Sequence, residues 1–119
     1  MAVDIGPKIG IEGESEFRKQ LKNVNEQIKT LGSEMKVVET AFEGQEKSEE
    51  ALTAKSRVLT EEIGKQREKV DLLTKGLKES AEKYGENDER TLKWQQAVNN
   101  ATAELNKMEN QLDKTTAEL

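Results

Sequence analysis

Large apolar residues recur at alternating steps of four and three along residues 17–42, and almost nothing else in that stretch is large and apolar. A mean step of three and a half residues keeps such side chains on one stripe of an α-helix, where they pack against a neighbouring helix. The spacing therefore predicts a long helix with a narrow apolar seam. The residues of this seam are Phe17, Leu21, Val24, Ile28, Leu31, Met35, Val38 and Phe42.

The same heptad frame continues through the rest of the chain. With Phe17 at position d, the later seam residues also fall at a or d, and two breaks containing Gly44 and Gly85 neither add nor remove a residue from the count. The sequence thus predicts an all-α protein of long heptad-patterned helices. Either one interrupted coiled-coil rod or a helical hairpin satisfies the pattern. The later seam residues are Leu52, Leu59, Ile63, Val70, Leu73, Leu77, Tyr84, Trp94, Val98, Leu105, Met108 and Leu112.

Residues 1–14 differ from the rest and predict a short extended arm. Val3, Ile5, Ile9 and Ile11 alternate with other residues, as in a strand, but glycines and Pro7 interrupt the run. A lone strand has no partner for its backbone groups unless another element supplies an edge. Two states are open, a flexible arm and an arm that becomes ordered on a partner.

Start and stop signals divide the remainder into three helices. Ser15 and Ser48 are expected to cap the first two, and Asn87 or Asp88 the third, because short polar side chains accept hydrogen bonds from free N–H groups at a helix start. The expected helices cover residues 15–43, 48–84 and 88–119. Three glycines inside them, Gly32, Gly64 and Gly76, each cost about 1 kcal/mol against alanine. Each of these glycines either allows a neighbouring helix to approach closely or is a position where the helix tolerates a loss of stability.

The composition excludes several kinds of site. The 119 residues include no cysteine and no histidine, which rules out disulfides, thiol chemistry and zinc sites of the usual ligand type. The 19 basic and 24 acidic residues are finely mixed, so we expect no direct nucleic-acid binding. No run approaches 18 consecutive apolar residues, so we expect no membrane-spanning segment. Acidic neighbours on a solvated helix lack the cleft that acid–base catalysis needs, and we expect no enzyme, cofactor or metal site.

Two stretches resemble a known family. The opening KIGIEGESEFRKQLKNVNEQIKTLGSEMKVVETAF resembles the amino-terminal segment of phage tail tape measure proteins, particularly those of long-tailed phages and prophages of Gram-positive bacteria. The likeness is carried by the isoleucine–glycine run at residues 9–11, by Phe17 and by the SEM at residues 33–35. The later KYGENDERTLKWQQAVNNATAELNKMENQL is similar to the Tyr–Gly stop, acidic turn and Trp-containing helix that follow in that family.

The resemblance implies a virion structural protein, located in the tail lumen after assembly in the host cytoplasm. Such proteins run along the tube as extended helical chains and set tail length, so tail tube protein and tail assembly chaperones are the implied partners. We also expect a homo-oligomer through the helix seam. Because tape measures are far longer than 119 residues, we expect this chain to be an amino-terminal fragment. The alternative is a generic cytosolic coiled-coil adaptor that binds a partner helix.

Replacing both Leu21 and Ile28 with Asp should abolish helicity or assembly. Isolated helices gain little from propensity alone, so packing through the seam supplies most of their stability. Circular dichroism and sedimentation measure the two outcomes. Unchanged spectra and an unchanged sedimentation coefficient would count against the seam.

Overall fold

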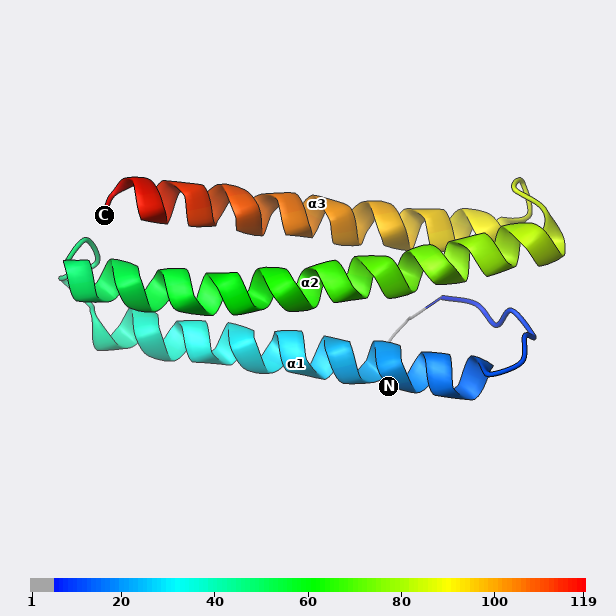
Figure 1. Ribbon diagram of the computed structural model, residues 1–119, viewed down its shortest axis with the longest axis horizontal. Coiled ribbons are helices and arrows are strands. Elements are labelled where there is room, and N and C mark those ends of the chain that lie inside the picture. The colour runs from blue at the N-terminus through cyan, green and yellow to red at the C-terminus, as the bar shows by residue number, and fades with distance from the viewer. Residues whose placement is uncertain (1–5) are drawn as a thin grey trace.

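The structure, a computed structural model, describes residues 6–119, which form three α-helices and no strand. Helix α1 spans Glu14–Ala41, α2 spans Glu49–Tyr84 and α3 spans Glu89–Ala117. Two consecutive reversals place α2 between α1 and α3 (Figure 1). The prediction of an all-α protein with long heptad-patterned helices is confirmed. Of the two architectures compatible with the pattern, the chain adopts helical hairpins. The Cα atoms extend over only 52 × 24 × 20 Å, which excludes a single rod.

Each reversal contains a glycine with positive φ. The φ of Gly44 is 80° and that of Gly85 is 98°, a conformation that residues with a side chain rarely adopt. The helices that follow begin with side-chain caps, as expected. Ser48 accepts a hydrogen bond from the Ala51 N–H at 3.1 Å, and Asp88 accepts one from the Arg90 N–H at 2.9 Å.

The start of α1 differs from the prediction, because Ser15 is not its cap. Gly13 occupies the N-cap position without a side-chain hydrogen bond, and the helix begins at Glu14. The Glu14 carboxylate turns back to the preceding arm and accepts hydrogen bonds from the N–H groups of Ile9, at 2.8 Å, and Gly10, at 2.7 Å. The Glu14 side chain therefore bonds to the backbone of the arm and does not cap the start of α1. Val3 and Ile5 of the expected extended run lie outside the described residues.

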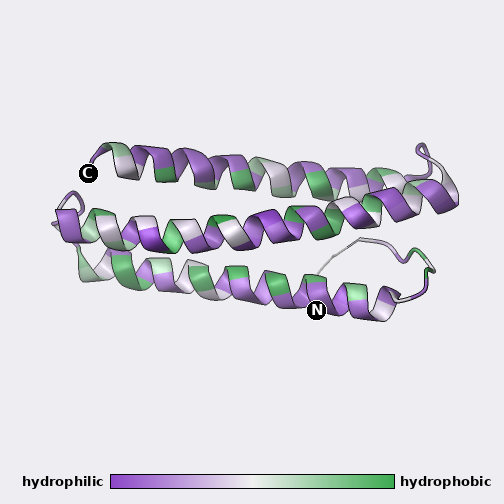
Figure 2. Ribbon diagram, in the orientation of Figure 1, coloured by the Kyte–Doolittle hydropathy of each residue, from purple (hydrophilic) through white to green (hydrophobic). Residues whose placement is uncertain are grey.

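The two heptad positions of the seam are buried unequally. In Figure 2 the hydrophobic residues of α1 lie along the edge that faces α2. Position d forms the centre of the bundle, where even the polar Gln66 and Ser80 are buried. Position a lies at the flanks of the helix contacts and is mostly half-buried. The buried seam residues are Phe17, Leu21, Val24, Leu31, Leu52, Leu59, Ile63, Leu73, Trp94 and Met108. The half-buried ones are Ile28, Met35, Val38, Phe42, Val70, Leu77, Tyr84, Val98, Leu105 and Leu112.

The Trp94 ring is fully buried and packs against bare backbone at two glycines. A Cβ atom on Gly76 of α2 would lie 2.5 Å from the ring, and one on Gly6 of the arm would lie 2.7 Å from it. Cβ atoms in proteins do not approach other atoms this closely. The Trp94 ring therefore fits in this position only because Gly76 and Gly6 have no side chain. The indole N–H donates to the Pro7 carbonyl at 3.2 Å, and the Phe17 ring lies 5.9 Å away between centroids. Trp94 thus joins the arm, α1, α2 and α3.

Replacing Gly76 with Ala should lower the free energy of unfolding by about 1–3 kcal/mol, because the added methyl group overlaps the Trp94 ring. Gly64→Ala is the matched control, since a Cβ there meets nothing within 4 Å. It should raise the same free energy by up to about 1 kcal/mol through helix propensity. Urea denaturation followed by circular dichroism measures both. Equal effects of the two substitutions would contradict the packing described for Trp94.

Candidate functional site: the arm seat and the interhelical groove

Three side chains at the end of α2 and the start of α3 hold the arm by its backbone. The Tyr84 hydroxyl donates to the Ile9 carbonyl at 2.8 Å, Lys83 Nζ donates to the Gly10 carbonyl at 2.6 Å, and Trp94 donates to the Pro7 carbonyl. We call Lys83, Tyr84 and Trp94 the arm seat. Ile9 itself is fully buried in the core cluster. Residues 7–10 of the arm are therefore held by helices of their own chain.

The turn between α2 and α3 fixes the Tyr84 ring. The Arg90 guanidinium lies 3.4 Å from the centre of that ring, which is a favourable cation–π geometry. Arg90 also donates two side-chain hydrogen bonds to Asp88, at 2.9 and 3.1 Å. These bonds and the Arg90 backbone N–H lower the pKa of Asp88 from 3.8 to about 2. Asp88 stays ionised in neutral solution, and the turn keeps the phenol directed at the arm.

Glu14 ties the arm to α1 electrostatically. Partial burial raises the pKa of Glu14, but the N–H groups of Ile9 and Gly10 and the Arg18 guanidinium together lower it by more. The net pKa lies below the ordinary value of 4.5. The carboxylate is thus ionised near neutral pH, where it holds both arm N–H groups.

A groove continues from the arm seat between α1 and α3. No Cα atom of α1 lies within 8 Å of any in α3 over the full described length of both helices, because each packs on α2 instead. The groove has a volume of about 860 Å³ and begins beside Gly6 and Pro7. Its lining combines apolar side chains such as Ile28, Leu73 and Met108 with side-chain amides and charged groups from all three helices.

The floor of the groove holds polar groups removed from water. Gln66 is buried and donates to the Ala101 carbonyl at 2.9 Å. Burial and the nearby Glu39 raise the pKa of Glu62 above 4.5. Burial lowers the pKa of Lys69, although Glu104 partly offsets the effect. The two shifts have a common physical cause, which is the poor solvation of the groove floor.

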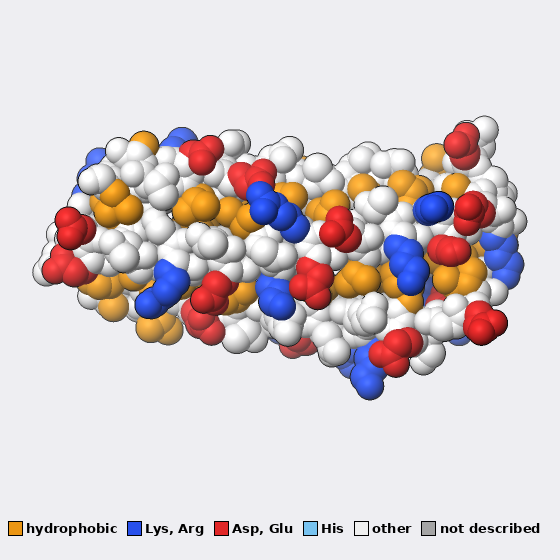
Figure 3. Space-filling view, viewed as in Figure 1, with side chains coloured by type: hydrophobic (Ala, Val, Ile, Leu, Met, Phe, Trp, Pro, Cys, Tyr) orange, Lys and Arg blue, Asp and Glu red, His pale blue; other side chains and the backbone are white. Residues whose placement is uncertain are grey.

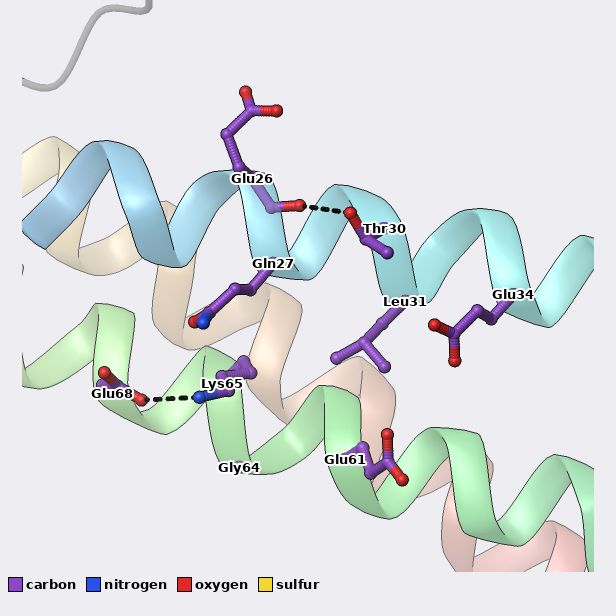
Figure 4. Close-up of a pocket in the computed structure, with 9 residues that line it drawn as sticks. All are labelled: Glu26, Gln27, Thr30, Leu31, Glu34, Glu61, Gly64, Lys65 and Glu68. Atoms are coloured by element: carbon purple, nitrogen blue, oxygen red, sulfur yellow. Dashed lines mark hydrogen bonds and ion pairs between the residues drawn. The ribbon is translucent and has the colours of Figure 1, made fainter.

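A second, shallower hollow of about 690 Å³ lies between α1 and α2 (Figure 4). Leu31 points towards α2 at its centre, and Gly64 leaves its lower wall without a side chain. Glu34 and Glu61 stand near one another at its edge, while Glu26 points away from it. The hollow therefore presents several acidic groups on an open surface.

The described residues contain no candidate metal site and no candidate membrane span. Over residues 6–119 no group of three or more acidic side chains could hold a metal ion. None of the helices in that part of the chain is long and apolar enough to span a bilayer. On the face drawn in Figure 3, acidic and basic side chains alternate without forming a patch of one sign.

Heptad analysis identified the core of the site and missed its polar part. The heptad pattern places Tyr84 and Trp94 in the seam, and the structure brings them together at the arm. Lys83 and Gly76 lie outside positions a and d, so the heptad pattern gives no signal for them. No family model, no curated protein and no solved structure matches this chain.

Replacing Glu62 with Gln should raise the free energy of unfolding modestly at pH 7, since solvent screens the charge of a half-buried carboxylate. The pKa of Glu62 is higher in the folded protein, so its charge costs stability above that pKa, and the cost disappears as the pH falls below 4.5. The gain should therefore vanish in acid. Glu61→Gln, an exposed neighbour on the other face, is the control and should change little. A gain for Glu62→Gln that persists at pH 3.5 would contradict this origin.

Proposed function

We propose that this chain is the amino-terminal part of a phage tail tape measure protein, a non-enzymatic virion protein of the tail lumen. The observation that carries the proposal is the resemblance of two stretches, residues 8–42 and 83–112, to the start of that family. By that resemblance the partners are tail tube subunits and assembly chaperones, met in the host cytoplasm. Association of copies through the half-buried a positions is part of the proposal.

The positions of the resembling residues support it. Ile9, Phe17, Tyr84 and Trp94 carry the likeness, and all four meet where the arm contacts the helices. Heptad repeats are easily imitated by unrelated helices, whereas an arm held by a specific tyrosine and tryptophan is not implied by a heptad pattern. The residues that carry the resemblance therefore belong to one packed cluster, which heptad periodicity alone does not explain.

The mechanism is geometric. A tape sets length because an α-helix converts residue number into distance at 1.5 Å per residue. In the bundle the described residues extend over 52 Å. Opened into one helix, the same residues would reach roughly 170 Å by the helix rise. The segment's contribution to tail length thus depends on which form it takes in the tube.

The alternative is a helical adaptor that binds a partner segment. One observation favours it: the chain folds back on itself and leaves a groove between α1 and α3. In this case, tail assembly would not depend on the chain. Gene neighbourhood gives a first discrimination, since tube and chaperone genes beside a much longer reading frame would favour the tape.

In-frame removal of residues 6–119 from the phage or prophage gene should shorten the tail by between 52 Å, for an intact bundle, and roughly 170 Å, for a continuous helix. Electron microscopy of the particles measures this length. The control carries Leu92→Ser on the exposed face of α3, which changes no residue count and should leave tail length unchanged. Tails of normal length and number from the deletion would refute the proposal.

A further inference from the structure

The packing of α1 changes at Gly32. All the buried residues of α1 precede this glycine, and the arm and the core cluster also meet the helix there. Beyond it Met35 and Val38 are only half-buried, and Val37 is 67% exposed. We call residues 34–41 the distal segment of α1. It is packed less tightly than the part of the helix before it.

No polar contact holds the distal segment to the rest of the bundle. Within the described chain, no hydrogen bond and no ion pair joins residues 34–41 to α2 or α3. By contrast, a buried hydrogen bond of 2.9 Å between Ser80 and Thr91 joins α2 to α3. An ion pair of 2.7 Å between Arg67 and Glu109 joins the same two helices. Apolar contacts alone therefore hold the distal segment against α2.

Like charges flank that apolar contact on both sides. At the edge of the hollow, Glu34 of α1 stands near Glu61 of α2 (Figure 4). Lys65 also lines the hollow, but it pairs with an acidic residue of its own helix. On the side of the groove, burial and the charge of the nearby Glu39 raise the pKa of Glu62. Both pairs of carboxylates favour separation of the two helices.

The residues least suited to a helix lie where the burial of α1 ends. Helices kink preferentially at Gly/Ser pairs, and Gly32 precedes Ser33. The Ser33 hydroxyl donates to the Thr30 carbonyl at 2.6 Å, and the Thr30 hydroxyl donates to the Glu26 carbonyl at 3.0 Å. Such bonds compete with the backbone ladder and often bend helices. Packing does not require the glycine, because a Cβ atom there would meet nothing within 4 Å.

We propose that Gly32 and Ser33 form a hinge about which residues 34–41 separate from α2 as one unit, while residues 14–31 stay in the bundle. Opening exposes Met35 and other half-buried side chains, so the closed form predominates. So short a segment does not remain helical in water once it is detached. The proposal is independent of the tape measure assignment, because tail length and helix opening are separate measurements.

Hydrogen exchange of the isotope-labelled protein, followed by nuclear magnetic resonance, measures this opening at each amide. The amides of residues 36–41 bond to carbonyls at or beyond the hinge. They should share one protection factor, at least about tenfold lower than that of residues 21–30. Gly32→Ala should raise it about three- to fivefold, because alanine favours an unbroken helix. Gly64→Ala is the matched control, since a Cβ there also meets nothing within 4 Å, and it should leave these amides unchanged.

A second substitution keeps the test decisive if Gly32→Ala alters the stability of the whole bundle. Glu39→Lys changes an exposed side chain and replaces the repulsion of Glu62 with an attraction. It should raise the protection of the distal amides about two- to fivefold. Glu26→Lys is its control, because it makes the same change of charge on a side chain that points away from the hollow. It should have no effect on these amides.

Protection that falls steadily from residue 32 to residue 41 would overturn the proposal, because the helix end would then be fraying one residue at a time. Equal protection before and after residue 32 would overturn it as well, since the distal segment would open only with the whole bundle. The hinge would also be refuted if neither Gly32→Ala nor Glu39→Lys raised the protection above that of its control.

Discussion

The packing of the Trp94 ring on Gly76 and Gly6 is the contact on which the rest of this structure depends. It brings α3 close to α2 and holds the arm against the same ring. The Phe17 ring adds α1 to the same cluster. A protein with only four aromatic residues among 119 uses two of them here, where each buries more apolar area than an aliphatic residue would. The remaining length of the helices is held by smaller side chains at position d.

The arm extends this cluster by polar contacts that a helical bundle alone does not supply. Its backbone carbonyls face the arm seat, and its N–H groups face Glu14. A buried backbone group without a partner is costly, so a non-helical segment packs into the bundle only where side chains bond to its backbone. The seat and Glu14 meet this condition at one end of the bundle.

Much of the fold was predictable because local rules set it. Helix ends fall within two residues of the expected positions, since Ser48, Asp88 and Gly85 act through hydrogen bonds and backbone angles that depend on near neighbours. The exception is Ser15, where the Glu14 side chain bonds to the arm and α1 begins without a side-chain cap. That bond depends on where residues 9 and 10 lie in space, and no capping rule contains this information. Within the arm seat, only Tyr84 and Trp94 were predictable, because these two residues also belong to the heptad.

By itself the sequence determined the helices, their apolar stripe and the absence of thiol and imidazole chemistry, because periodicity and composition are properties of the chain alone. The heptad frame, unbroken through both turns, was compatible with a rod and with hairpins, since both bury positions a and d. Only the tertiary structure decided for hairpins, with α2 between its neighbours and a groove left between α1 and α3. It also decided that Gly76 is a close contact while Gly32 and Gly64 border open space. A glycine has the same effect on an isolated helix wherever it stands, and its role depends on which residue packs against it.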